Sequence, residues 1–439
     1  MRYIRFIWLT AMLFFMSFIL FYQVGQAADS LEIEAESAIL VDGNSGTILY
    51  EKNADERLSP ASMTKMMTEY LILEAMTNGD ITWDQHVPIS DYAYTISQKY
   101  PELSNVPLLK EETYTVEELY KAMAIYSANG ATIALTELVS GSEKAFVEEM
   151  NAKARDFGLS EYEFFNSTGL NNRDLDGQHP AGGPEDENIL SARATALLAF
   201  RLIHDYPEVH DIASIPIDEF TAGVDEPIEM INWNWMLPGL DLEYEGIDGL
   251  KTGSTALAGN SFTASAKRND VRLISVVMKT ESRIARFRET EKLLDWGFSQ
   301  FSYEEIVPKG FQIENESVLA VDKGKEKSVE VEAANRLNIL VKNGEKELYE
   351  PVYQWDDEKV VNGRLVAPVE EGEKVGVVSI TYNGDNDYQS ITGESQPSTD
   401  LITTEAVERA NWFSLGMRAV GNFFSGLWSK VTDSVKGIF

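Results

Sequence analysis

The sequence predicts an α/β domain, of the α+β kind, followed by a small all-β domain and a C-terminal amphipathic helix. Residues 28–298 mix strand-like runs with segments whose apolar residues recur at steps of three and four, as one face of a helix requires. Residues 299–395 contain short alternating runs between Asn-Gly turns, which indicate a β domain. Residues 409–439 return to the helical spacing, after a predicted linker over residues 396–408.

The N-terminal segment has the pattern of an export signal. Arg2 and Arg5 precede a strongly apolar run over residues 6–22, and the small residues of 25–28 follow it. This order is typical of a signal peptide, so residues 1–27 are left out of the fold prediction. The apolar run is long, and an uncleaved membrane anchor is the alternative interpretation.

The next segment predicts a hairpin and then a helix. Strand-like residues 37–41 and 47–50 flank an Asp-Gly-Asn-Ser-Gly turn, so the two runs are expected to pair. Pro60 then comes shortly before Ser62, as at the start of a helix. Helical spacing is shown by Met63, Met66, Met67, Tyr70 and Leu71. Ser62 is therefore predicted at a helix N-terminus.

Two further helical segments and a second hairpin complete the first domain. Residues 114–140 have helical periodicity that breaks at Ser127-Ala128-Asn129-Gly130, which predicts a loop between two helices. Residues 191–206 form an amphipathic helix rich in Ala and Leu. Strand-like runs over residues 260–266 and 271–278 surround an Asn-Asp turn and predict a hairpin.

The last segment predicts a helix that lies on a membrane surface. Its apolar stripe comprises Phe413, Met417, Val420, Phe424, Leu427, Val431, Val435 and Ile438. Its charged residues are mostly cations, although the chain as a whole is strongly acidic. A basic amphipathic helix of this kind binds in the plane of an anionic membrane. Packing on its own domain or on another chain is the alternative, because those contacts require the same periodicity.

Composition excludes several classes of function. The formal net charge is −34, which repels nucleic acid phosphates. There are no cysteines, so neither disulfides nor a thiol nucleophile is expected. The four histidines lack the His-Glu-x-x-His spacing of a zinc site, and no phosphate-binding glycine loop is present. We therefore expect no metal and no cofactor.

Three short motifs carry the chemistry. They are Ser62-Met63-Thr64-Lys65, Ser127-Ala128-Asn129 and Lys251-Thr252-Gly253. Each motif alone is weak: the first could be a helix-capping serine beside a solvated lysine, the second an ordinary loop, and the third a strand end. Together and in this order they supply a serine nucleophile, lysines that move protons, and a strand edge that aligns a peptide.

The spacing of the first motif predicts how the nucleophile is activated. Lys65 follows Ser62 by one helical turn, so both side chains lie on one face. A neutral lysine amine can accept the serine proton, and this requires a lowered lysine pKa. Burial and a second cation, for which Lys251 is the candidate, both lower it.

The motifs and their surroundings resemble the penicillin-recognising serine enzymes, and within them the low-molecular-mass D-alanyl-D-alanine carboxypeptidases of the penicillin-binding protein 5 type. The similarity extends to the segment Leu49–Lys65, the stretch Asn166-Ser167-Thr168-Gly169-Leu170, the block 246–278 and the segment 289–297. It implies a catalytic domain with the serine β-lactamase and transpeptidase fold, an appended β domain and a membrane-surface helix.

The resemblance also implies a role for each site residue. Ser62 would attack the carbonyl between two terminal D-alanines, with Lys65 as base and with Ser127, Asn129 and Lys251 completing the proton network. The backbone N–H groups of Ser62 and Ser254 would form the oxyanion hole. The terminal carboxylate of the substrate would be bound beside Gly253 by Thr252, Thr255 and Arg286. Some family members have histidine directly after Lys-Thr-Gly, where this chain has Ser254.

Substrates, inhibitors and location follow from the same resemblance. The implied substrate is the peptidoglycan stem peptide that ends in D-Ala-D-Ala, and β-lactam antibiotics are the implied covalent inhibitors. The implied location is the outer face of the cytoplasmic membrane, with peripheral attachment through the C-terminal helix.

Two alternatives remain at this stage. A class A β-lactamase shares all three motifs and needs a deacylating glutamate, for which Glu187 in Glu187-Asn188-Ile189-Leu190-Ser191 is the nearest match. We expect Glu187 to be a solvated loop charge beside Glu185 and Asp186. A non-catalytic wall-binding protein is the second alternative, although decayed motifs would then be expected.

Overall fold

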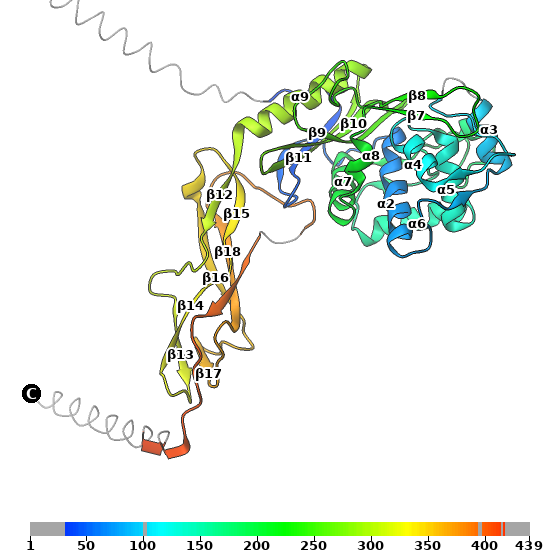
Figure 1. Cartoon of the computed structure of the whole chain (residues 1–439). Coiled ribbons are helices and arrows are strands. Elements are labelled where there is room, and N and C mark those ends of the chain that lie inside the picture. Colours follow the sequence, from blue (N-terminus) through cyan, green and yellow to red (C-terminus); the bar gives the residue numbers. More distant parts are fainter. Residues whose placement is uncertain (1–30, 100–102, 394–396, 414–415, 418–439) are drawn as a thin grey trace, which may run out of the picture.

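The computed structural model describes residues 31–99, 103–393, 397–413 and 416–417. The predicted signal peptide and nearly all of the predicted C-terminal helix lie outside these residues. The described chain forms a larger α/β domain followed by an elongated β domain (Figure 1). The predicted fold class is confirmed for these two domains.

A five-stranded sheet is the centre of the α/β domain. Its order is β2-β1-β11-β10-β9, and neighbouring strands are antiparallel. Both predicted hairpins are present, one formed by β1 and β2 and the other by β10 and β11. The strands are β1 (Ser37–Asp42), β2 (Ile48–Lys52), β9 (Ile247–Thr255), β10 (Gly259–Arg268) and β11 (Val271–Thr280).

Helices cover both faces of this sheet. Side chains of a strand alternate between faces, and β1 is buried on both: Ile39 and Val41 join one core, whereas Ala38 and Leu40 join the other. The first core includes α7 (Ala192–Asp205), which confirms the helix predicted over residues 191–206. The second core includes α9 (Arg283–Gln300), which lies along β10 and β11. The sheet is therefore the middle of three layers.

The helical part of the domain packs on the first face. A break between α4 and α5 is present as predicted, but it covers residues 125–128, and Asn129 and Gly130 begin α5 instead of lying in the loop. The helices here are α2 (Lys65–Thr77), α3 (Asp91–Lys99), α4 (Val116–Ala124), α5 (Asn129–Ser140), α6 (Glu143–Asp156) and α8 (Val209–Ala213), with the 3₁₀ turns η1 (Ala61–Thr64) and η2 (Asn172–Leu175). Short strand pairs tie the loops together: β3 (His86–Val87) with β4 (Tyr114–Thr115), β5 (Tyr162–Glu163) with β6 (Ile189–Leu190), and β7 (Ile217–Phe220) with β8 (Ile228–Ile231).

The second domain is built of strands around its own hydrophobic core. It contains a two-stranded sheet, β12-β15, and a six-stranded sheet in the order β16-β18-β19-β14-β13-β17. The strands are β12 (Phe301–Val307), β13 (Val318–Asp322), β14 (Ser328–Ala333), β15 (Leu337–Lys342), β16 (Tyr349–Trp355), β17 (Arg364–Val366), β18 (Lys374–Tyr382) and β19 (Thr399–Thr403), with the 3₁₀ turn η3 (Lys346–Leu348).

The predicted linker over residues 396–408 is wrong for most of its length. Residues 399–403 form strand β19, which lies between β18 and β14. Leu401 is fully buried in the core of the β domain, and Val407 bridges to Val369. Burial of these apolar side chains outweighs the turn-like composition of the preceding residues.

The two domains meet at the turn between β1 and β2. The hydroxyl of Tyr303, on β12, donates to the buried carboxylate of Asp42 at 2.9 Å and accepts a hydrogen bond from Asn44. The backbone N–H of Ile48 donates to Gln389, and that of Ile391 donates to Gly46. The β domain is thus fixed to the turn of the first hairpin.

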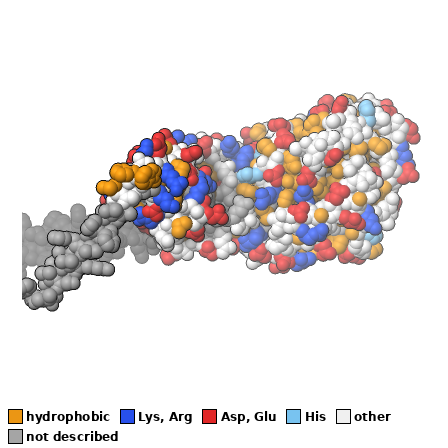
Figure 2. Space-filling model, turned by 90° about the horizontal axis from the view of Figure 1, so that it is seen from below, with side chains coloured by type: hydrophobic (Ala, Val, Ile, Leu, Met, Phe, Trp, Pro, Cys, Tyr) orange, Lys and Arg blue, Asp and Glu red, His pale blue; other side chains and the backbone are white. Residues whose placement is uncertain are grey.

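Charged side chains of both signs are interspersed over the visible face of both domains (Figure 2). Among the described residues, no helix combines the length and the hydropathy that crossing a bilayer requires. Also among them, no group of three or more His, Asp or Glu side chains is arranged to bind a metal ion.

Candidate active site

Ser62 lies on the tight turn η1, which leads directly into α2. Two glycines let other segments approach this turn closely. A Cβ atom on Gly169 would lie 1.9 Å from the carbonyl oxygen of Ala61, and a Cβ atom on Gly253 would lie 2.3 Å from that of Pro60. Only glycine tolerates such close approaches. Gly169 and Gly253 therefore allow the loop after residue 166 and strand β9 to contact turn η1.

The side chain of Lys65 is fully buried and lies beside Ser62. Its Nζ atom donates to Asn129 Oδ1 at 2.8 Å and to the carbonyl oxygen of Thr168 at 2.7 Å. The distance from Nζ to Ser62 Oγ is 3.2 Å. The amine is therefore held by two fixed acceptors, with the nucleophile as its third neighbour.

Three buried charged groups act on this amine, namely Lys251, Glu69 and Glu143. Burial, and then the positive charge of Lys251, hold the pKa of Lys65 well below its ordinary value. Burial also lowers the pKa of Lys251 to about 8, against the opposing effect of the Glu69 carboxylate. Burial raises the pKa of Glu69 to about 7, against the effects of both lysines. The predicted pair of lysines is present, together with a glutamate that the sequence reasoning missed.

Glu69 could have been found from its position on the helix. It follows Lys65 by four residues on α2, so the two side chains lie on the same face. The sequence reasoning expected an apolar face at this point and therefore assigned no role to a glutamate there.

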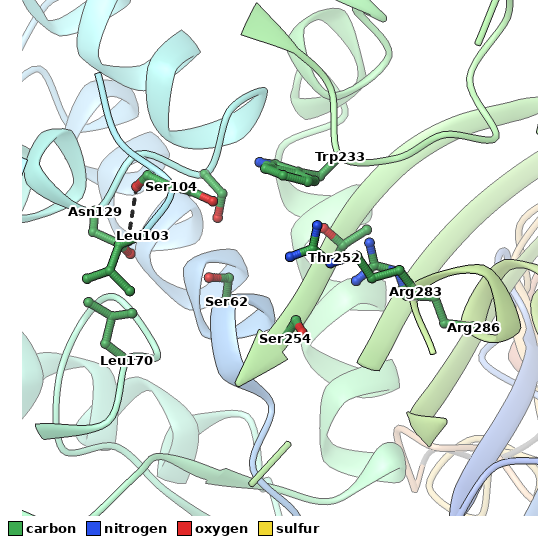
Figure 3. A pocket seen from close by; sticks show the side chains of 11 residues that line it. Ser62, Leu103, Ser104, Asn129, Leu170, Trp233, Thr252, Ser254, Arg283 and Arg286 are labelled. Carbon is green, nitrogen blue, oxygen red and sulfur yellow. Dashed lines mark hydrogen bonds between the residues drawn. The ribbon is translucent and has the colours of Figure 1, made fainter. Parts of the chain in front are cut away.

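Ser127 and Asn129 enter the site from the loop between α4 and α5. Ser127 has a φ angle of +61°, and its buried hydroxyl has no hydrogen-bond partner. Asn129 is the first residue of α5, and its Nδ2 atom donates to the carbonyl oxygen of Ser104 at 3.0 Å (Figure 3). This bond and the bond from Lys65 fix which way the amide of Asn129 points. The hydroxyl of Ser127 is left available to a ligand.

A buried carboxylate supports the loop that holds Lys65. Glu143 accepts hydrogen bonds from the backbone N–H and the hydroxyl of Ser167, and from the hydroxyl of Tyr92. Asn166 Oδ1 accepts from the backbone N–H groups of Thr168 and Gly169. These bonds determine where the carbonyl of Thr168 lies.

The third motif lies on β9, at the edge of the five-stranded sheet. An edge strand has one side of its backbone unpaired within the sheet, so an extended peptide can align beside it. Lys251 is buried, whereas Ser254 is exposed. Thr252 and Ser254 both line the cavity in front of Ser62.

The predicted site residues are largely brought together in that cavity, which has a volume of about 110 Å³. Six of them line it: Ser62, Ser127, Asn129, Thr252, Ser254 and Arg286. Figure 3 shows Ser62 between the helical side, with Asn129, and the strand that carries Thr252 and Ser254. The sequence reasoning assigned no role to five other residues of the lining, namely Leu103, Ser104, Leu170, Trp233 and Arg283. Leu103, Ser104 and Trp233 lie in loops, where no periodic pattern marks them.

Arg286 lies on α9 and is almost fully buried. Its Nη1 atom is 3.4 Å from the carbonyl oxygen of Gly253, and its Nε atom has no hydrogen-bond partner. Burial, and then the charge of Arg283, lower the pKa of Arg286 to about 9. The Nε–H group of this guanidinium can therefore donate a hydrogen bond to an anion.

The hydroxyl of Thr255, which was predicted to meet the substrate carboxylate, donates to Glu187 at 2.9 Å, and the residue is not part of the cavity lining. The expectation for Glu187 needs correction. Glu187 is buried rather than solvated, and it also accepts hydrogen bonds from Ser59 at 2.5 Å and from Asn171 at 3.3 Å. The carboxylate connects the end of β9 to the segment that precedes the nucleophile, a contact between distant residues that local sequence does not show.

Comparison with known proteins identifies the family. Residues 23–282 match peptidase family S11, described as D-alanyl-D-alanine carboxypeptidase. The chain belongs to this family. Residues 301–409 match the C-terminal domain of penicillin-binding protein 5, so the β domain of the chain is also found in the family. The resemblance inferred from the motifs is confirmed.

Relatives cover nearly the whole chain. D-alanyl-D-alanine carboxypeptidase DacF of Bacillus subtilis is 32% identical over 401 residues, which are 91% of this chain and 93% of the relative. The peptidoglycan synthesis regulatory factor PBP3 from Streptococcus pneumoniae is 35% identical in sequence. Its crystal structure matches with a TM-score of 0.72 over 85% of this chain and 99% of that chain. Penicillin-binding protein D2 from Listeria monocytogenes, in its cefotaxime-bound form, is 30% identical in sequence. Its structure matches with a TM-score of 0.52 over 61% of this chain and 98% of that chain.

Proposed function

We propose that this protein is a serine D-Ala-D-Ala carboxypeptidase that removes the terminal D-alanine from peptidoglycan stem peptides. The observation that carries the proposal is the contact of Lys65 Nζ with Ser62 Oγ, Asn129 Oδ1 and the carbonyl oxygen of Thr168 in one buried site. A family assignment names an activity, whereas this contact supports a specific nucleophile and a specific base.

Lys65 acts as the base because its surroundings favour the neutral amine. A neutral amine has two N–H bonds and one lone pair. Asn129 Oδ1 and the carbonyl oxygen of Thr168 accept hydrogen bonds from the two N–H groups, so the lone pair is directed at Ser62. The amine can then take the proton of the Ser62 hydroxyl as its oxygen attacks the peptide carbonyl.

The remaining groups complete one acyl transfer. The bond between the carbonyl carbon and the leaving nitrogen breaks, and Ser127 passes a proton to the departing amine of D-alanine. The backbone N–H groups of Ser62 and Ser254 stabilise the oxyanion. Water then hydrolyses the acyl-enzyme. A β-lactam follows the same steps of acyl transfer. Its ring opens without releasing a fragment, so the opened ring remains bound to Ser62.

The terminal carboxylate is bound at the Thr252 end of the cavity. Thr252 and Arg286 line this end, and the unpartnered Nε atom of Arg286 supplies a charged donor. Thr255 takes part indirectly, because its hydroxyl is bonded to Glu187.

The buried position of Glu187 favours a peptidase over a class A β-lactamase. A deacylating glutamate must reach a water molecule beside the acylated serine. Here the carboxylate accepts hydrogen bonds from Ser59, Asn171 and Thr255 and is absent from the lining of the cavity.

Release of D-alanine from diacetyl-L-Lys-D-Ala-D-Ala tests the proposal. Wild-type protein should release D-alanine, and Lys65→Ala should slow the release by at least about 100-fold, since it removes the general base. Lys144→Ala, at an exposed position of α6, is the matched control and should behave as wild type. Undiminished release by a folded Lys65→Ala protein would contradict the proposal.

We also propose that the protein is exported and that it attaches to the outer face of the cytoplasmic membrane through residues 409–439. Support comes from the basic amphipathic pattern of this segment. Trp412, Phe413 and Met417 are 83%, 61% and 59% exposed. Hydrophobic side chains also appear at the outer end of the β domain in Figure 2. Interfacial aromatic residues of this kind favour a membrane surface.

Sedimentation with lipid vesicles tests the attachment. Protein lacking its signal peptide should sediment with vesicles that contain phosphatidylglycerol, and less with pure phosphatidylcholine vesicles. A chain that ends at Glu408 should remain in the supernatant while it still releases D-alanine. Equal sedimentation of the two chains would contradict the membrane role.

A further inference from the structure

A stack of three side chains stands at one end of the catalytic cavity. The indole of Trp233 lies against the ring of Tyr126, with centroids 6.2 Å apart, and its Nε1 atom donates to the carbonyl oxygen of Tyr126 at 3.1 Å. On Trp233 lies the guanidinium of Arg283, with its Cζ atom 5.2 Å from the ring centroid. The indole is the most favourable ring for a cation–π contact.

This stack connects the two walls of the cleft. Tyr126 immediately precedes Ser127, so it belongs to the helical wall. Arg283 is the first residue of α9, which packs on β10 and β11 and therefore belongs to the sheet wall. Trp233 lies between them, and Figure 3 shows it with Arg283 near Thr252 and Arg286, away from Leu103 and Leu170. Side chains from both walls thus meet at this end of the cleft.

The bridged end is also positively charged. Arg283 and Arg286 both line the cavity, and burial, followed by the positive charge of Arg283, lowers the pKa of Arg286. Within the part of the chain that the structure describes, neither arginine forms an ion pair with an acidic side chain. Two neighbouring cations without a protein counter-ion are stabilised by an anion that a ligand brings.

We propose that Arg283 and Trp233 form a gate that restricts the enzyme to peptides that end, with a free carboxylate, one residue after the scissile bond. This inference rests on the proposed function. Trp233 and Arg283 occupy the space that a longer chain would need, and Arg283 with Arg286 favours the carboxylate that a chain end carries. Arg283 is a specificity-determining residue and takes no part in proton transfer.

Three versions of one peptide separate the two effects of the gate. They are diacetyl-L-Lys-D-Ala-D-Ala as the free acid, its C-terminal amide, and the same peptide extended by glycine. The amide removes the negative charge at nearly constant size, whereas the glycine extension retains a carboxylate but moves it further along the chain. Wild-type protein should cleave the free acid much faster than the other two.

Arg283→Ala should raise KM for the free acid about tenfold with little change in kcat, because it removes a charged contact to the terminal carboxylate. The amide lacks that carboxylate, so its slow cleavage should change little, and the preference for acid over amide should fall by the same factor. Trp233→Ala should open the end of the cleft and raise the rate on the glycine-extended peptide relative to the free acid. Trp233→Phe keeps a ring there and should retain most of the discrimination.

Arg288→Ala is the matched control, because Arg288 is exposed on the same helix and lines a different surface depression with Met236 and Glu291. It should keep both substrate ratios of wild type. Unchanged ratios in both Arg283→Ala and Trp233→Ala would overturn the gate, even though wild-type protein releases D-alanine. Failure of wild-type protein to cleave the free acid would instead contradict the proposed function.

Discussion

Four buried ionisable side chains set the chemistry of this site: Lys65, Lys251, Glu69 and Glu143. Transfer of a single charge into a protein interior is strongly unfavourable, and opposite charges nearby reduce that cost. Burial lowers the pKa of Lys65 and raises that of Glu69 to about 7, so it favours the neutral form of both, which leaves one lysine and one glutamate as a balanced pair. The neutral Lys65 that the proposed mechanism needs is therefore also an electrostatically favourable state of the folded protein.

Glu69 should control the alkaline limit of activity. Because Lys251 has a pKa of about 8, kcat/KM should fall as pH rises through this value and Lys251 loses its charge. The carboxylate of Glu69 raises the pKa of Lys251, and Glu69→Gln removes that effect. The alkaline limb should therefore move to lower pH.

A pH profile of kcat/KM for D-alanine release measures this shift. Glu74→Gln is the control on the same helix, since Glu74 pairs with Lys153 instead. An alkaline limb that stays in place in Glu69→Gln, or that moves to higher pH, would refute the role of Glu69.

Ser127 should matter to activity far more than to stability. Its buried hydroxyl has no partner in the folded protein, so Ser127→Ala breaks no hydrogen bond and should change the free energy of unfolding by less than about 1 kcal/mol. Loss of the proton relay should slow D-alanine release by about 100-fold or more. Thermal unfolding measures the stability of Ser127→Ala, and the release assay measures its activity. A large loss of stability with normal D-alanine release would contradict this prediction.

Sequence patterns predicted Ser62 as nucleophile and Lys65 as base, and they named six of the residues that line the cavity, because these residues occur in motifs of fixed order. They assigned no role in the site to Glu69, Trp233 or Arg283, and they placed Glu187 in solvent. Those roles depend on burial and on contacts between segments far apart in the chain: Glu187 and Ser59, for example, are 128 positions apart. Local composition suggested a solvated Glu187 because the two residues before it are acidic.

The secondary-structure elements bring the motifs together by close backbone contact. Turn η1 lies between strand β9 on one side and the loop that carries Thr168 and Gly169 on the other. The prediction that a helix starts near Ser62 is correct in position, although residues 61–64 form a 3₁₀ turn before α2 begins. The tighter 3₁₀ turn was not predictable, because over four residues the spacing of apolar side chains does not distinguish a 3₁₀ turn from an α-helix.

Gly169 and Gly177 offer a matched test of this contact. Both have left-handed backbone angles, with φ of +79° and +75°. A Cβ atom at Gly169 would overlap the carbonyl of Ala61, whereas at Gly177 it would meet nothing within 4 Å. Gly177→Ala should cost only about 1–2 kcal/mol of backbone strain. Gly169→Ala should cost more and should also displace Ser62.

Thermal unfolding and the rate of labelling by a fluorescent penicillin measure the two effects. Labelling should be lost in Gly169→Ala and retained in Gly177→Ala. Equal behaviour of the two variants would show that the contact with Ala61 does not position the nucleophile.

The described molecule is two domains, joined through the turn of the first hairpin and through Phe301 and Leu340 of the β domain, which belong to the core between the five-stranded sheet and α9. The change in composition near Gly297 predicted the second domain correctly. The end of that domain was misplaced, since β19 pairs with β14, and the paired residues are 68 to 72 positions apart in the chain. Such pairing leaves no signal within a local window of sequence.

Tyr303→Phe should weaken the junction between the domains without affecting catalysis. It removes the hydroxyl that donates to the buried carboxylate of Asp42, at a cost of about 1–3 kcal/mol in the free energy of unfolding. D-alanine release should be unchanged, because neither residue lines the cavity. Denaturant unfolding with the release assay checks this, and a loss of activity at wild-type stability would contradict it.

Mapping of a penicillin adduct tests the central claim most directly, that a neutral Lys65 activates Ser62 in one buried site. Intact mass should rise by the full mass of the penicillin, because the opened ring loses no fragment, and proteolysis should place the adduct on Ser62. Lys65→Ala should form this adduct much more slowly while remaining folded. An adduct on any other residue, or acylation of Lys65→Ala at the wild-type rate, would contradict the account.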